Sequence, residues 1–199
     1  DSDVKTPNDF TMEAWVALEL TDPNDDWQVV MASSCGVLQA NAATGEVGLG
    51  VWHDCSGTGS YTSWESQAMI AVGEWQHIAV THQRDSGVGT TSFFVDGKSY
   101  ANSGSPSSST SGNTHMAGIG ALAVQGQSVI YNPTLAGLVS GVRYSEGIRY
   151  TAEFQADPLL AQDASTVALF QLDEGVGQEV YEADASVTGQ IHGARWVND

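Results

Sequence analysis

The sequence contains few basic residues. Lysine and arginine together number 6, against 24 aspartate and glutamate residues, and the formal net charge is −18. Because a field of this sign repels phosphate groups, nucleic acid and anionic membrane surfaces are poor partners for this chain, and we expect it to bind no nucleic acid. Such a chain suits a saline environment, and some of its carboxylates are also available to bind a divalent cation.

Long apolar runs are missing as well. No stretch approaches the ~20 apolar residues that a membrane-spanning helix needs, and the chain does not open with a basic segment followed by an apolar one, as a signal peptide would. We therefore expect no membrane insertion. The start at Asp1 fits a mature or excised domain. Because all-β sandwiches commonly use about 200 residues as one unit, we expect residues 1–199 to form a single domain.

Only two cysteines are present, Cys35 and Cys55. Without a CxxC spacing they argue against a zinc site. Each lies beside small turn residues, and their even number favours a disulfide between them, which would place the protein outside the cell or on its surface. The alternative is a pair of buried free thiols.

No segment carries the pattern of a normal helix, and short strands dominate instead. Asp9 to Leu20 alternates apolar and polar residues, which predicts a long strand with one buried face. Asn102 to Thr114 is polar and predicts a long surface loop, whereas Gln190 to Val197 predicts a last strand that pairs near the first. About ten to fourteen strands with turn signals every ~8 to 12 residues indicate a sandwich or barrel.

The stretch Gly73 to Lys98, GEWQHIAVTHQRDSGVGTTSFFVDGK, predicts the centre of the fold. It contains a shielded central strand, a second strand at Ser92 to Val95 and a tight turn at Asp96-Gly97. Trp75 and Trp196 are predicted to be core residues.

Within this stretch, Trp75 is followed by Ile-Ala-Val-Thr at 78–81 and by Phe-Val-Asp-Gly at 94–97. In these motifs the stretch resembles the laminin G-like and pentraxin-like domains of the concanavalin A-like superfamily. Gly137 to Phe154 and Val167 to Val197 are similar to later parts of the same family. The resemblance implies an all-β jelly-roll sandwich of two antiparallel sheets, as in many lectin domains. It implies an activity only weakly.

Two acidic stretches are candidate calcium sites, because calcium takes six to eight oxygen ligands from carboxylates, amides and carbonyls. The first comprises Asp22, Asn24, Asp25 and Asp26. The second comprises Asp173, Glu174 and Asp184, and the family resemblance supports it more, since members often carry calcium in loops at a sheet edge. The alternative is a pair of solvated turns capped by their own side chains.

A sugar-binding surface is the second candidate site. Along Glu46 to His53, alternate residues point outward: Gly48, Gly50 and Trp52. The glycines leave a shallow surface on which an aromatic ring can stand exposed. We expect aromatic faces to bind a pyranose and polar groups to bind its hydroxyls. The candidate ligand residues are Trp52, His53, Asp54, Tyr61 and Trp64, although a tryptophan such as Trp52 or Trp64 can equally be a core residue.

Catalytic motifs are missing or incomplete. The Glu-x-Asp-x-x-Glu motif of glucanases with this fold does not occur. Gln190-Ile191-His192 matches a short motif of jelly-roll alginate lyases, in which the histidine could act as a general base. The accompanying Arg-and-Glu and Tyr-x-Lys strands of those enzymes are missing. Neither a nucleophile elbow nor a phosphate-loop lysine occurs. We therefore expect no catalytic residues.

Together these features predict an extracellular binding module that recognises a glycan, with calcium as a possible cofactor. The alternative is a structural or adhesion module of a surface protein that binds protein partners, and a polysaccharide-active enzyme comes third. The sequence specifies neither the glycan nor the oligomeric state.

Overall fold

The computed structural model describes residues 9–19, 27–41, 43–52, 59–84, 89–111, 115–124, 130–131 and 134–197. Every regular element in these ranges is a β-strand. The described residues contain no helix of the length and apolarity that crossing a membrane requires.

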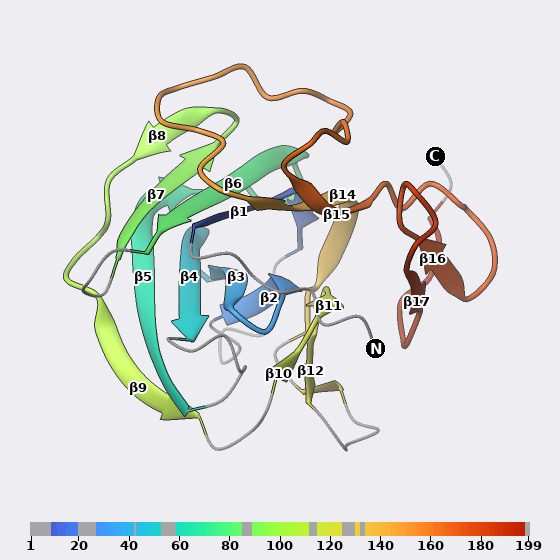
Figure 1. Cartoon of the computed structure of the whole chain (residues 1–199), viewed down its shortest axis with the longest axis horizontal. Helices are drawn as coiled ribbons and strands as arrows, with labels where there is room; N and C mark the ends of the chain where they lie inside the picture. Colours follow the sequence, from blue (N-terminus) through green and yellow to red (C-terminus); the bar gives the residue numbers. More distant parts are fainter. Residues whose placement is uncertain are drawn as a thin grey trace.

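Two antiparallel six-stranded sheets form the body of the molecule (Figure 1). The upper sheet has the order β15-β14-β1-β6-β7-β8. Its strands are β1 (Phe10–Leu18), β6 (Gln76–Gln83), β7 (Thr90–Val95), β8 (Lys98–Tyr100), β14 (Gly137–Glu146) and β15 (Thr166–Phe170). The lower sheet has the order β11-β2-β3-β4-β5-β9. Its strands are β2 (Trp27–Ala32), β3 (Gly36–Asn41), β4 (Glu46–Trp52), β5 (Gly59–Met69), β9 (Ser107–Ser111) and β11 (Gly118–Ile119).

Two small sheets lie outside this sandwich. One joins β10 (His115–Met116), β12 (Leu122–Val124) and β13 (Ile130–Tyr131). The other is a hairpin of β16 (Glu179–Tyr181) and β17 (Thr188–Gln190). The all-β sandwich that the sequence predicts is therefore confirmed.

The core lies between the inner faces of the two main sheets. Five alternate residues of β1 are at most 1% exposed: Phe10, Met12, Ala14, Val16 and Leu18. They belong to one buried cluster with residues of the lower sheet such as Leu49 and Trp64. Burying each of the larger ones, Phe10, Met12, Val16 and Leu18, stabilises the fold by about 1.5–3 kcal/mol. The period of two thus marks the core-facing residues of β1 correctly, but the prediction of a single buried face is wrong, because Thr11 and Glu13 on the opposite face are also 0% exposed.

The predicted central meander is also confirmed. Strand β6 lies between β1 and β7 in the upper sheet, and β7 turns into β8 at Asp96 and Gly97, whose φ angles are 50° and 75°. The Asp96 carboxylate accepts hydrogen bonds from the His77 backbone N–H at 2.9 Å and from the Gln76 side-chain amide at 3.0 Å. These bonds fix the turn against the start of β6.

Three predictions for individual segments are wrong. The polar stretch Asn102 to Thr114 contains β9, which pairs with β5 because serine-rich edge strands still form backbone ladders. Of the two predicted core tryptophans, Trp75 is 44% exposed because it lies in the turn before β6 rather than in the strand, and Trp196 is partly exposed and bonds to Gly177 outside both main sheets. The predicted strand from Gln190 to Val197 does not form: β17 ends at Gln190 and pairs with β16, residues 191–197 are not a strand, and β1 lies between β14 and β6.

Candidate ligand-binding face

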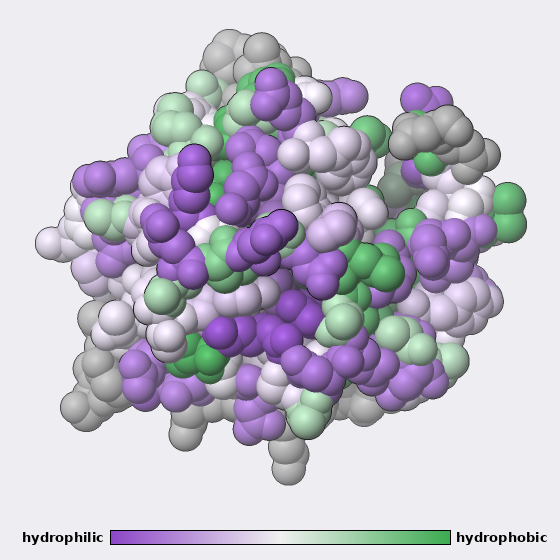
Figure 2. Space-filling view, turned by 90° about the horizontal axis from the view of Figure 1, so that it is seen from above, coloured by the Kyte–Doolittle hydropathy of each residue, from purple (hydrophilic) through white to green (hydrophobic). Residues whose placement is uncertain are grey.

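The outer face of the upper sheet is covered by the chain itself. Segment 147–165 crosses it, as the orange trace above β1 and β6 in Figure 1 shows. Its backbone is tied to the sheet by hydrogen bonds from Phe154 N–H to the Gly97 carbonyl at 2.9 Å and from Arg149 N–H to Thr11 Oγ1 at 3.1 Å. Seen from above, this covered side of the molecule is largely hydrophilic (Figure 2).

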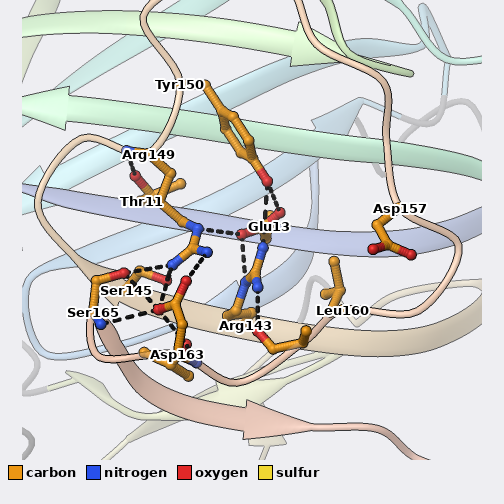
Figure 3. A network of polar contacts seen from close by, with 12 residues as sticks. Thr11, Glu13, Arg143, Ser145, Arg149, Tyr150, Asp157, Leu160, Asp163 and Ser165 are labelled. Carbon is orange, nitrogen blue, oxygen red and sulfur yellow. Dashed lines mark hydrogen bonds and ion pairs between the residues drawn. The ribbon is translucent and has the colours of Figure 1, made fainter.

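Beneath the segment lies a buried polar network centred on Glu13 (Figure 3). The fully buried Glu13 carboxylate accepts hydrogen bonds from Arg143 Nε at 2.7 Å and from the Tyr150 hydroxyl at 2.8 Å. It also contacts His77 Nε2 at 3.0 Å. Arg143 also donates a hydrogen bond to the carbonyl of Ala161, which lies near the end of segment 147–165. The network therefore fastens segment 147–165 onto the sheet.

Charge partners keep Glu13 ionised in this buried position. Burial by itself would raise its pKa, but the hydrogen bonds from His77 and Arg143 and the attraction to Arg143 outweigh that effect, so the pKa falls from 4.5 to about 2. Burial also raises the pKa of Tyr150 to about 12, and Glu13 contributes to that rise. Since these groups bond to one another under a covering segment, we assign them a structural role.

The outer face of the lower sheet carries the features of a ligand platform. Alternate residues of β3, β4 and β5 point to this face, and the register places Gln39, Gly48 and Glu65 side by side in one row. The next row contains Val37, Gly50 and Ser63. Gly48 and Gly50 thus lie next to each other on this face, as the sequence predicted for β4, whereas Val37 is 3% exposed and belongs to a small buried cluster against which Tyr61 packs.

Trp27 fills the first glycine position. A Cβ atom on Gly48 would lie 2.6 Å from Cζ3 and 2.9 Å from Cη2 of the Trp27 ring, closer than real contacts allow. The ring of Trp27, which is itself partly exposed, therefore lies directly on the Gly48 backbone. Tyr61 lies beside the second glycine, with its Cδ2 atom 3.9 Å from the position of a Cβ on Gly50. The Trp27 ring thus lies on one glycine, and the Tyr61 ring lies beside the other.

Polar groups surround these rings. Gln39 and Ser63 are partly exposed and Glu65 is exposed. The Ser63 hydroxyl is 2.8 Å from the Ser107 hydroxyl of β9. An aromatic surface bordered by an amide, a carboxylate and hydroxyl groups can bind a ligand that has both an apolar face and hydroxyl groups.

The predicted ligand residues are only partly brought together on this face. Tyr61 lies on it, directly opposite Trp52 in register, while His53, Asp54 and the side chain of Trp52 lie outside the described part of the structure. Trp64 is 4% exposed and points into the core, where its ring centroid is 5.0 Å from that of His82. Trp64 is therefore not a ligand platform, because residues 61 and 64 of one strand face opposite sides of the sheet.

Trp27, Gln39 and Glu65 are not among the ligand residues that the sequence predicts. The outward-facing glycines of β4 indicate that another side chain or a ligand packs against the backbone of this strand. The ring that does so comes from β2, two strands away in the sheet, and no local pattern in the sequence identifies that neighbour.

The second calcium candidate is dispersed. Asp173 and Asp184 are exposed. Asp184 Oδ1 accepts a hydrogen bond from the Ser186 backbone N–H at 2.8 Å, and hydrogen bonds from the Ser186 side chain and then its backbone lower the pKa of this carboxyl. Glu174 accepts a bond from the Tyr181 backbone N–H at 2.7 Å. Within the described ranges no group of three acidic, histidine or cysteine side chains is close enough to hold a metal ion. Asp22, Asn24, Asp25 and Asp26 lie outside these ranges.

Cys35 is completely buried beside the core. The described residues include no free cysteine, but Cys55 lies outside them, and the bond between the two stays a prediction. The Gln190-Ile191-His192 motif lies at the end of β17, outside both main sheets, and His192 is exposed.

Comparison with known proteins agrees with this architecture. A family model described as the concanavalin A-like lectin/glucanases superfamily matches residues 1–153. A proposed carbohydrate-binding protein from Bacteroides ovatus shares the fold, with a TM-score of 0.62 and 16% identity over 96% of this chain and 56% of that chain. This chain thus spans little more than half the length of the Bacteroides protein.

A native heptameric SAP-like pentraxin from Limulus polyphemus matches with a TM-score of 0.43 and 14% identity, over 94% of this chain and 84% of that one. Among curated proteins, no sequence matched. Since the family model covers more than half of the chain, as the Trp, Ile-Ala-Val-Thr and Phe-Val-Asp-Gly segments predicted, the chain belongs to the concanavalin A-like lectin/glucanases superfamily.

Proposed function

We propose that this chain is a non-catalytic carbohydrate-binding module whose ligand lies on the outer face of the lower sheet. The observation that carries the proposal is the Trp27 ring, which lies on Gly48 with Gln39 and Glu65 in the same row. The carbohydrate binding proposed for the Bacteroides protein agrees with it.

The chemistry of the face favours neutral sugars. The C–H face of a pyranose packs on an indole or phenol ring, and its hydroxyls donate to carboxylates and amides. With 6 basic residues against 24 acidic ones, the protein would repel uronates and sulfated glycans. Trp27 and Tyr61 would therefore contact the ring faces, and Glu65 and Gln39 the hydroxyls.

Calorimetry with gluco-, galacto-, xylo- and manno-oligosaccharides tests the proposal. Trp27→Ala should weaken binding of the preferred glycan at least tenfold, since a stacked aromatic ring contributes more than about 1.4 kcal/mol. The matched control is Trp75→Ala, because Trp75 is also solvent-accessible, at 44%, but lies in a turn outside the platform. Equal loss in both variants, or none in either, would contradict the proposed site.

A second candidate function is adhesion to a protein partner. Three apolar side chains, spaced three residues apart between the end of β5 and the start of β6, are exposed: Met69 by 59%, Val72 by 43% and Trp75 by 44%. Exposed apolar groups of this kind are common in protein interfaces. If adhesion is the function, Trp75→Ala should abolish partner binding while Trp27→Ala leaves it intact, which reverses the pattern expected for a glycan.

Calcium and an extracellular location are part of the proposal. A calcium ion that binds only the native state raises its stability by RT ln(1 + [L]/Kd), so thermal unfolding in excess calcium and in chelator should differ. Unchanged transitions would remove calcium from the proposal. Mass spectrometry of protein alkylated in denaturant without reductant should show Cys35 and Cys55 protected, as expected for a disulfide in an oxidising compartment, whereas two buried free thiols would be alkylated.

A further inference from the structure

The hairpin of β16 and β17 stands apart from the sandwich (Figure 1). It forms its own two-stranded sheet and is joined to β15 by the bridge between Phe170 and Glu182 and by a hydrogen bond from Ala183 N–H to the Leu169 carbonyl at 2.8 Å. The matching family model ends before it, at residue 153.

The outward side of this hairpin exposes apolar groups that contribute little to its own stability. Val176 is 76% exposed and Tyr181 is 45% exposed. The opposite side is packed, since Val180 is 9% exposed and lies against Gly189. An isolated two-stranded hairpin is at best marginally stable, so exposed apolar groups on it call for another explanation.

These groups line a shallow hollow of about 370 Å³. Its wall is formed by Val176, Gly177, Gln178, Glu179, Tyr181 and Gln190. The rim is held in place from both sides, because Trp196 Nε1 donates to the Gly177 carbonyl at 3.1 Å and Ile191 N–H donates to the Gln178 carbonyl at 2.8 Å. A hollow of this size is in the range that holds a small ligand.

A hydrogen-bonded triad forms one wall of the hollow. The two oxygens of the Glu179 carboxylate accept one bond each, from the Tyr181 hydroxyl at 2.7 Å and from the Gln190 side-chain amide at 3.0 Å. The Tyr181 bond and then the Gln190 bond lower the pKa of Glu179, so the carboxylate is ionised. Because the Tyr181 proton points at Glu179, the phenol oxygen and the carboxylate present acceptor lone pairs to the hollow.

We propose that this hollow is a second sugar-binding site, in which a pyranose lies against Tyr181 and Val176 and donates hydroxyl hydrogen bonds to Glu179. The ligand must bring donors and an apolar face together, and an anion would be repelled by the carboxylate. This site shares the ligand class of the proposed function but no residue with the sheet face, so each can fail without the other.

Two-dimensional NMR of the full chain tests the second site, with the indole N–H signal of Trp196 as the reporter and Trp196→Phe to assign it. The probes are the methyl glycosides of glucose, galactose and mannose, added in turn at millimolar concentration. At least one should shift the Trp196 signal saturably, with a millimolar Kd typical of a shallow single-sugar site.

Tyr181→Ala should weaken this titration at least tenfold, and Tyr181→Phe, which keeps the ring and loses the bond to Glu179, severalfold. Two controls should leave it unchanged: Leu159→Ala, since Leu159 is 65% exposed on another segment, and Trp27→Ala on the sheet face. No saturable shift with any of the three glycosides, or an equal shift in Tyr181→Ala, would overturn the second site. Loss of the Trp196 shift in Trp27→Ala would also overturn the second site, because it would assign the binding to the outer face of the lower sheet.

Discussion

At the scale of single residues, the pair Gly48 and Trp27 decides the form of the candidate ligand face. Gly48→Ala should force the Trp27 ring off the face, because the new Cβ would lie 2.6 Å from it. We expect a loss of about 1–3 kcal/mol in the free energy of unfolding and a changed tryptophan fluorescence spectrum.

Gly50→Ala is the matched control for Gly48→Ala. It lies on the same face of the same strand, and its Cβ would be 3.9 Å from Tyr61, an ordinary contact distance. We expect it to be neutral or slightly stabilising, since alanine loses less entropy than glycine in a strand. Similar effects of the two substitutions would show that the Trp27 ring does not depend on Gly48.

Glu13 is the second residue on which much depends. Glu13→Gln removes the charge that compensates the buried Arg143, and breaking one partner of such a pair costs about 3–5 kcal/mol. Urea denaturation measures the change, with Glu153→Gln as a control because Glu153 is exposed in the same covering segment. A loss below about 1 kcal/mol would mean that Glu13 is not the anchor of the network.

At the scale of elements, segment 147–165 depends on the turn between β7 and β8. A Cβ on Gly97 would lie 1.8 Å from the Phe154 carbonyl oxygen, and Gly97 has a φ of +75°. Gly97→Ala should therefore lift the segment, destabilise the fold by about 2 kcal/mol or more, and accelerate amide hydrogen exchange across residues 147–165.

Gly73→Ala separates backbone strain from this clash. Gly73 has a φ of +76° and nothing within 4 Å of its Cβ position, so it should show the strain alone, about 1 kcal/mol. Its exchange pattern in segment 147–165 should match the parent protein. If Gly97→Ala behaves in the same way, contact with Phe154 does not hold the segment.

At the scale of the whole molecule, net charge and the Glu13 network predict opposite responses to acid. From neutral pH down to about 5, protonation of surface carboxylates reduces the repulsion within a chain of formal charge −18, so stability should hold or rise. Below pH 4.5 the Glu13 contribution is lost, because its folded pKa of about 2 is lower than its ordinary value of 4.5.

The sign follows from which state binds the proton more tightly. The unfolded chain takes up the Glu13 proton first, so the stabilisation is complete above pH 4.5 and disappears as the pH falls through about 2. A difference of this size corresponds to about 3 kcal/mol. Denaturation midpoints measured across this range should show the loss in the parent protein and a much smaller one in Glu13→Gln. Equal slopes would contradict the role of Glu13.

The features that a few neighbouring residues determine could be predicted from the sequence. The alternation in β1, the Asp96-Gly97 turn and the outward glycines of β4 each depend on a few neighbouring residues, and all three appear in the structure. The burial of Trp75 could not be predicted, because β6 begins one residue after it. Strand β9 could not be predicted, because its partner β5 lies far away in the sequence.

The sequence by itself determined the all-β class, the central meander, the acidic character and the family, because strand periodicity, turn chemistry and charge are properties of short stretches. Only the tertiary structure decided which aromatic residue packs on Gly48 and that segment 147–165 covers the outer face of the upper sheet. The physical reason is strand register. Trp27 meets Gly48 across β3, and Glu13 meets Arg143 from strands whose paired residues are more than a hundred positions apart.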